Sequence, residues 1–203
     1  MAITVRQFEQ MKGRLSGARR VATPVFEESR PVATAGGGAV ILGIDPSLRG
    51  TGFGIIRAVK PQPRVLAHGT VSCPAGWERS RCLVKIAQTL RELVRQHQPT
   101  VGVVEGLFYA QNLQTALIMG EARGVCLAVV AEAGLEVYEI APRKVKQAVV
   151  GYGAAQKVAV AKMVQRLLRL AELPAPDAAD ALALGLAFAQ ETGGFSLNPP
   201  KRI

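Results

Sequence analysis

The segment Ala39-Val-Ile-Leu-Gly-Ile-Asp-Pro-Ser47 is a short apolar run that ends in an aspartate and a proline. A run of this length bounded by turn residues is typical of a buried strand. A second apolar run, Thr51-Gly-Phe-Gly-Ile-Ile56, follows a turn that contains proline and glycine, and a third run occupies 65–71. These three segments predict a meander of three strands joined by short turns.

Helices and strands alternate after this meander. We predict a helix at 80–96, a strand at 100–104, a long helix at 112–130, a strand at 136–140, basic helices between 143 and 170, and a last helix at 177–190. This order indicates an α/β fold with a mixed five-stranded sheet that is flanked by helices.

The folded domain is expected to span residues 40–191, between a basic N-terminal extension at 1–39 and a C-terminal tail at 192–203. The extension ends in Pro31-Val-Ala-Thr-Ala-Gly-Gly-Gly38, which has the composition of a flexible linker. Its role stays open between a tethered arm, a start-site artefact and a targeting segment.

Lysine and arginine total 25 against 15 acidic residues, which gives a net charge of +10 in 203 residues. Because 49% of the residues are hydrophobic, we expect a folded domain with a polyanionic partner rather than a disordered basic tail. No apolar run approaches the ~20 uninterrupted residues of a membrane span, so we expect a cytoplasmic protein without a membrane partner. Cys73, Cys82 and Cys126 lack CxxC spacing and are expected to be reduced core residues.

The chain has only three aspartates, and each lies at the end of a predicted element. Asp45 closes the first strand and Glu105 closes the fourth, while Asp177 and Asp180 open the last helix. Strand ends are where an open α/β sheet presents functional groups, so carboxylates from two strands can face one site. For the helix pair taken alone, capping of the helix N-terminus is the favoured interpretation.

A cluster of four carboxylates repels itself and needs cations. Hard oxygen ligands select Mg²⁺ or Mn²⁺. Two such ions, about 4 Å apart, would stabilise the attacking and leaving oxygens when a phosphodiester is displaced in line. The four residues therefore predict a metal-dependent nuclease site.

At these residues the sequence resembles the RuvC family of Holliday-junction resolvases, within the ribonuclease H-like superfamily. The resemblance covers residues 40–190 and rests on four ordered blocks: Ile41-Leu-Gly-Ile-Asp-Pro-Ser47 with Thr51-Gly52; Val104-Glu-Gly-Leu-Phe108 with Asn112 and Gly120-Glu-Ala-Arg-Gly124; Pro142 to Gly153 with Ala155-Gln-Lys157; and Asp177-Ala-Ala-Asp-Ala-Leu-Ala183. Ser47 and Gly106 depart from the residues that the family usually has at these positions.

This resemblance implies a ribonuclease H-like fold in which Asp45, Glu105, Asp177 and Asp180 are the catalytic residues and the metal ligands. It implies two Mg²⁺ ions per site, with Mn²⁺ as the other candidate. It also implies a homodimer that resolves four-way DNA junctions by paired nicks in strands of like polarity, in homologous recombination and DNA repair. A branch-migration complex would be a further partner.

Basic residues dominate between Ile140 and Glu172, a segment without an acidic residue. The expected DNA contacts are Arg143, Lys144, Lys146, Lys157, Lys162 and Arg166. By the resemblance, Lys146 and Lys157 match family positions that contact DNA. The spacing of Lys162, Arg166 and Arg169 places these three on one helical face.

Two aromatic residues follow Glu105 in a polar loop. The resemblance implies that Phe108 inserts at the junction crossover, and Tyr109 beside it is a further candidate for stacking on bases. Arg123 has two alternatives, an ion pair with Glu121 or a phosphate contact.

Ala116, Gly120 and Gly124 form a stripe of small residues on the helix at 112–130. This stripe permits close approach of another helix and is the expected dimer interface. A four-way junction is nearly two-fold symmetric, so two equivalent sites require a two-fold protein. Three other functions stay open: a ribonuclease H-like nuclease on RNA or RNA–DNA hybrids, a non-catalytic junction-binding protein, and an ATPase of the actin-like superfold.

Overall fold

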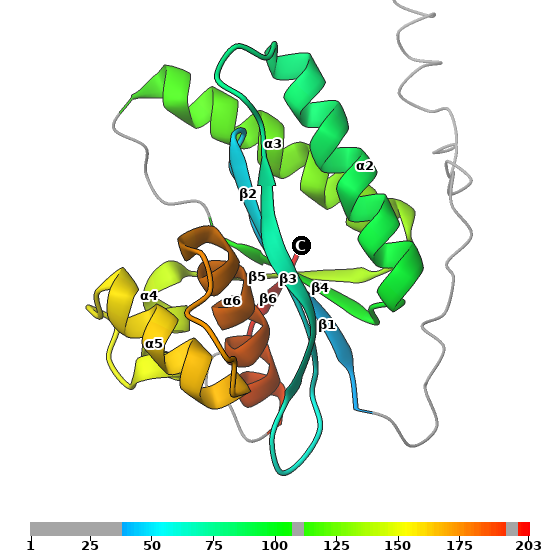
Figure 1. The fold of residues 1–203 in the computed structure, drawn as a ribbon. Helices are drawn as coiled ribbons and strands as arrows, with labels where there is room; N and C mark the ends of the chain where they lie inside the picture. The colour runs from blue at the N-terminus through cyan, green and yellow to red at the C-terminus, as the bar shows by residue number, and fades with distance from the viewer. Residues whose placement is uncertain (1–37, 107–111, 194–198) are drawn as a thin grey trace, which may run out of the picture.

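In a computed structural model, which describes residues 38–106, 112–193 and 199–203, a twisted sheet lies between two helical layers (Figure 1). Among these residues the sheet has six strands, in the order β3-β2-β1-β4-β5-β6. Their bounds are β1 Val40–Asp45, β2 Gly50–Arg57, β3 Arg64–Ser72, β4 Val101–Glu105, β5 Glu136–Ile140 and β6 Lys201–Arg202. Neighbours among β1, β2 and β3 are antiparallel, whereas β1, β4 and β5 run parallel. The predicted meander and the mixed sheet are confirmed.

The sixth strand corrects the expectation of five. β6 pairs antiparallel with β5, and Arg202 forms an ion pair with Glu136 at 2.9 Å between Nη1 and Oε1. Part of the expected C-terminal tail therefore belongs to the edge of the sheet. A strand of two residues is too short to show alternation of apolar and polar side chains, so no sequence pattern indicates it.

Within the described residues, two helices cover one face of the sheet and three cover the other (Figure 1). Their bounds are α2 Arg79–His97 and α3 Leu113–Glu132 on the first face, and α4 Pro142–Val150, α5 Lys157–Leu168 and α6 Pro176–Thr192 on the second. Because side chains alternate along a strand, Leu42 and Ile44 of β1 enter the core under α2 and α3, while Ile41 enters the core on the α6 side.

Glycines in β1 and β2 let the backbone of α6 lie directly against the sheet. A Cβ atom at Gly43 would come within 2.1 Å of the Ala181 carbonyl oxygen, and one at Gly52 within 2.0 Å of the Asp177 carbonyl oxygen. Any larger residue would force α6 away from the strands. The first turn of α6 is thereby held beside the end of β1, where Asp45 lies.

Helix α3 is long and apolar enough to cross a membrane by length and composition alone, although Glu121 and Arg123 interrupt its apolar residues. Its residues Ala122 and Val129 are buried in the core that α3 shares with α2. Such packing is that of a helix in a globular layer. All three cysteines are free and buried, as predicted.

Candidate active site

Two carboxylates end neighbouring parallel strands. Ile44 of β1 is in register with Val104 of β4, so Asp45 and Glu105 are the next residues of the two strands. Strand alternation directs both side chains to the face that α6 covers. The two carboxyl groups are hydrogen bonded to each other. The fold therefore brings these two side chains together at one edge of the sheet.

Burial prevents full ionisation of this pair. It raises the pKa of Asp45 from 3.8 to about 8, and the negative charges of Glu105 and Asp180 add to the rise. Burial also raises the pKa of Glu105, where the hydrogen bond with Asp45 acts in the opposite direction. At neutral pH the pair therefore holds one proton, which Asp45 donates to Glu105.

Asp180 of α6 faces the same pair, because its charge contributes to the raised pKa of both Asp45 and Glu105. Lys157, the first residue of α5, donates a hydrogen bond to Asp180 at 2.9 Å between Nζ and Oδ2. This bond raises the pKa of Lys157, which stays protonated. The structure therefore sets one ammonium group beside three carboxyl groups.

Asp177 lies against the start of β2, the strand next to the one that carries Asp45. A Cβ atom at Gly50 would come within 2.9 Å of Asp177 Oδ2, and Gly52 is the register partner of Asp45. The charge of Asp177 is not among the causes of the raised pKa of Asp45. The capping interpretation is wrong for Asp177, because Ala175 is the N-cap residue of α6.

Arg123 of α3 is buried and links the end of β4 to β5. Its guanidinium donates hydrogen bonds to the main-chain carbonyl of Glu105 and to the carboxylate of Glu139. The predicted ion pair with Glu121 is wrong, since Glu121 pairs with Arg79. The phosphate contact stays untested, and the guanidinium of Arg123 is buried against its two partners. The partners come from strands distant in sequence, so local spacing cannot reveal this link.

The predicted DNA contacts on α4 and α5 fall into two groups. Lys146 of α4 and Lys157 of α5 lie near the carboxylates, since both charges act on the pKa of Glu105. Lys144 instead forms an ion pair with Glu191, near the C-terminal end of α6, at 3.3 Å between Nζ and Oε2. Helix α4 therefore turns only one of these two lysines toward the site.

The other three predicted DNA contacts are Arg143, Lys162 and Arg166. Arg143 packs beside the turn that follows α4, and Lys162 of α5 is exposed. Arg166 lies about 14 Å from Lys157 along the axis of α5. The expectation that Arg169 shares a helical face with Lys162 and Arg166 is wrong, because Arg169 ends the helix in a left-handed conformation with φ 50°.

The two predicted stacking residues, Phe108 and Tyr109, lie outside the described residues. Gly106, two residues before Phe108, donates a main-chain hydrogen bond to the carbonyl of Ile140 at the end of β5. The stacking roles stay predictions.

Helix α3 presents an apolar face to solvent. The exposed fractions of Leu113 and Leu117 are 77% and 60%, and Gly124 is exposed as well. Ala116 and Gly120 are half-buried, and a Cβ atom added at Gly120 would meet no neighbouring atom within 4 Å. The predicted small-residue stripe therefore lies on an open surface beside two exposed leucines.

The donor set of the site suits hard divalent cations. Asp45, Glu105, Asp177 and Asp180 offer only carboxylate oxygens, which Mg²⁺ and Mn²⁺ prefer. Within the ranges that the structure describes, no three acidic, histidine or cysteine side chains are grouped so that they could hold a metal ion. An open arrangement fits Mg²⁺, which keeps several waters and is held by one or two carboxylates together with substrate phosphates.

Known proteins resemble this chain over most of the sheet domain. The family profile described as "Crossover junction endodeoxyribonuclease RuvC" matches residues 41–188, a range that contains all four carboxylates. A protein of that name from Akkermansia muciniphila is 45% identical over 161 residues, which are 79% of this chain and 93% of that protein. Another from Moorella thermoacetica is 46% identical over 151 residues, which are 74% of this chain and 90% of that protein.

Solved structures show the same likeness. T. thermophilus RuvC in complex with a Holliday junction substrate superposes with a TM-score of 0.73 at 33% identity, over 81% of this chain and 99% of that chain. The yeast mitochondrial Holliday junction resolvase Ydc2 superposes with a TM-score of 0.52 at 12% identity, over 74% of this chain and 78% of that chain. This second match is a likeness of fold alone.

Proposed function

The chain belongs to the RuvC family of crossover junction endodeoxyribonucleases, and we propose that its reaction centre is formed by Asp45, Glu105, Asp177 and Asp180. It is a structure-selective endonuclease that resolves four-way DNA junctions by paired nicks in strands of like polarity, in homologous recombination and DNA repair. One observation carries the assignment of the centre. Two carboxylates end adjacent parallel strands at the point where α6 turns Asp180 toward them.

The family needs a divalent metal, and we propose two Mg²⁺ ions per site, with Mn²⁺ as a substitute. Bound ions supply Lewis acidity to the phosphodiester and to water. The protein fixes Asp45 and Glu105 at the ends of two strands, and the proton that they share would pass to solvent water when cations bind. Lys157 keeps the Asp180 carboxylate turned toward this pair.

Lys146 and Lys157 are the proposed contacts to the phosphates next to the cleaved bond. Their position supports this proposal, since the charges of Lys146 and Lys157 both lower the pKa of Glu105. Lys144, by contrast, forms an ion pair with Glu191. Cationic side chains at this edge neutralise phosphates and release counterions.

A homodimer is the proposed working form, with α3 as its contact. The support is the outward face of Leu113, Leu117, Gly120 and Gly124, which recur at the spacing of one helical stripe. Exposed leucines beside glycines allow two helices to approach closely and to bury apolar area. A cytoplasmic location and cooperation with a branch-migration complex complete the proposal and are supported by family membership.

Substrate competition tests the proposed function against its alternatives. A labelled synthetic four-way junction is incubated with the protein and Mg²⁺ or EDTA, with linear duplex and RNA–DNA hybrid as competitors. Symmetric Mg²⁺-dependent nicks in the junction, unaffected by the hybrid, support it. Cleavage of the hybrid alone favours the ribonuclease H-like alternative, and tight binding without products favours a non-catalytic junction-binding protein.

A further inference from the structure

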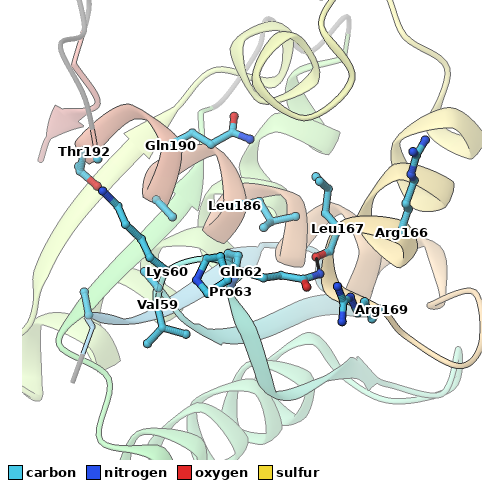
Figure 2. A pocket seen from close by; sticks show the side chains of 15 residues that line it. Val59, Lys60, Gln62, Pro63, Arg166, Leu167, Arg169, Leu186, Gln190 and Thr192 are labelled. Carbon is cyan, nitrogen blue, oxygen red and sulfur yellow. Dashed lines mark hydrogen bonds between the residues drawn. The ribbon is translucent and has the colours of Figure 1, made fainter. Parts of the chain in front are cut away.

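A groove of about 990 Å³ lies at the end of the sheet opposite the carboxylates (Figure 2). Its walls come from the loop after β2, the C-terminal end of α5 and the C-terminal half of α6. Ala39 lines the groove and directly precedes β1, whereas Asp45 ends that strand. The two residues are about 20 Å apart along an extended chain. The groove is therefore separate from the reaction centre.

The floor of this groove is apolar and preformed. Val59, Leu167 and Leu186 line it together with small apolar residues. The side-chain amide of Gln62 donates a hydrogen bond to the main-chain carbonyl of Leu167, which ties the loop after β2 to α5. Its volume lies in the range that holds small ligands or a few large side chains.

Three cations surround this apolar floor. Lys60, Arg166 and Arg169 line the groove and are exposed, with Lys60 on one side and the two arginines on the other (Figure 2). In the described part of the chain none of the three forms an ion pair, and the groove has no acidic lining residue. A second hollow of about 530 Å³ shares the same loop and adds Arg64. The rim is therefore uniformly positive.

We propose that this groove docks an acidic peptide segment of a partner protein, which places one or two large apolar side chains on the floor and carboxylates against the rim. The proposal is independent of the nuclease assignment. Charge complementarity selects the occupant, since Lys60, Arg166 and Arg169 have no acidic partner within the chain as described. A DNA backbone would meet the rim with phosphates but would bring nothing apolar to the floor.

The segments 1–37 and 194–198 of this chain have charges that do not complement the positive rim. Residues 1–37 carry six basic and three acidic residues, so their net charge has the same sign as the rim. The segment 194–198, Gly-Phe-Ser-Leu-Asn, has no acidic residue. By net charge these segments are weaker candidates than a partner protein, although Glu27 and Glu28 follow Phe26 within residues 1–37.

The test uses the full chain and a fluorescein-labelled synthetic peptide in which aspartates alternate with leucine and phenylalanine. Fluorescence anisotropy is expected to show binding that weakens about fivefold in Lys60→Glu, and further in a Lys60→Glu, Arg166→Glu double variant. The matched charge change Arg81→Glu lies on α2, on the opposite face of the sheet, and should leave the peptide affinity unchanged. Peptides with serine in place of either the aspartates or the apolar residues should bind about tenfold more weakly.

Three results would overturn the proposal. The first is an absence of peptide binding to the wild-type chain. Equal loss of affinity in Lys60→Glu and in Arg81→Glu is the second, because it shows attraction by net charge alone. A short DNA duplex that displaces the peptide, and that loses affinity in Lys60→Glu alone but not in Arg81→Glu, would assign the groove to DNA. Thermal unfolding of each variant separates these outcomes from loss of folding.

Discussion

The guanidinium of Arg123 donates a hydrogen bond to the main-chain carbonyl of Glu105, at the end of β4 and on the opposite side of the sheet from α6. The same guanidinium binds the carboxylate of Glu139 in β5. One buried cation therefore fixes the ends of two parallel strands. The position of the Glu105 carboxylate depends on this link, although Arg123 does not face the reaction centre.

Removal of this link is expected to lower the cleavage rate more than the junction affinity. In Arg123→Met the end of β4 loses its tie, and a small displacement of a reacting group costs about ten- to hundredfold in rate. The free energy of unfolding should fall by about 1–3 kcal/mol, because Glu139 loses its partner. Single-turnover cleavage, junction affinity and thermal unfolding are measured, with Arg123→Lys as the conservative control. An unchanged single-turnover rate in Arg123→Met would show that Glu105 is held by other contacts.

The raised pKa of Asp45 predicts a pH-dependent stability in metal-free protein. The folded chain keeps a proton on Asp45 up to about pH 8, whereas the unfolded chain releases it near 3.8. This contribution to the free energy of unfolding is therefore fully present below pH 3.8 and is lost as the pH rises through about 8. In EDTA at pH 9, Asp45→Asn should be more stable than wild type by about 0.5–2 kcal/mol, because carboxylate repulsion is removed.

This difference should be smaller at pH 6, where Asp45 of the wild-type chain is protonated. Thermal unfolding of both proteins at the two pH values measures it. A variant that is equally or less stable than wild type at pH 9 would contradict the repulsion between Asp45 and its neighbouring carboxylates.

The close approach of α6 to the sheet predicts a strong effect of one methyl group. In Gly52→Ala the new Cβ atom would lie 2.0 Å from the Asp177 carbonyl oxygen, so α6 must shift. We expect a loss of about 1–3 kcal/mol in the free energy of unfolding and reduced cleavage. Gly76→Ala is the matched control, because no atom lies within 4 Å of its Cβ position. Similar stability of the two variants would mean that α6 does not depend on this glycine.

A dimer built on α3 predicts that Gly120→Leu weakens self-association without harm to the domain. The added side chain meets no neighbouring atom of the domain within 4 Å at its Cβ, and it removes a helix glycine. Sedimentation equilibrium should show a dimer dissociation constant raised about tenfold or more. Val84→Ser removes an exposed apolar side chain from α2 and should leave association unchanged. An unaltered dimer in Gly120→Leu would exclude this face.

Some features of the fold and site follow from local sequence, and others depend on contacts between distant elements. Asp45 and Glu105 were predictable at strand ends, because a short apolar run that stops at an acidic residue is visible in the chain itself. The approach of Asp180 to them was predicted by taking the four carboxylates together and by the family resemblance, whereas its structural cause, the glycines in β1 and β2 that let α6 approach, was not. Helical periodicity also failed at Arg169, where a left-handed residue ends α5.

Contacts between residues far apart in the sequence could not be predicted from local patterns. Glu121 lies two residues before Arg123 in the sequence, yet the partners of Arg123 come from β4 and β5. Strand β6 is too short for a periodic signal and is defined by its pairing with β5. In both cases the folded sheet, rather than local propensity, decides the structure.

Cleavage and binding of one labelled four-way junction by wild type, Asp45→Asn and Glu105→Gln measure the role of the strand-end carboxylates. All three proteins are expected to bind the junction with similar affinity, because Lys146 and Lys157 are intact. With Mg²⁺, the two variants should lose cleavage by about a thousandfold, since groups that act as one unit fail together. Cleavage by Asp45→Asn at the wild-type rate would contradict the assignment of the reaction centre to these strand-end carboxylates.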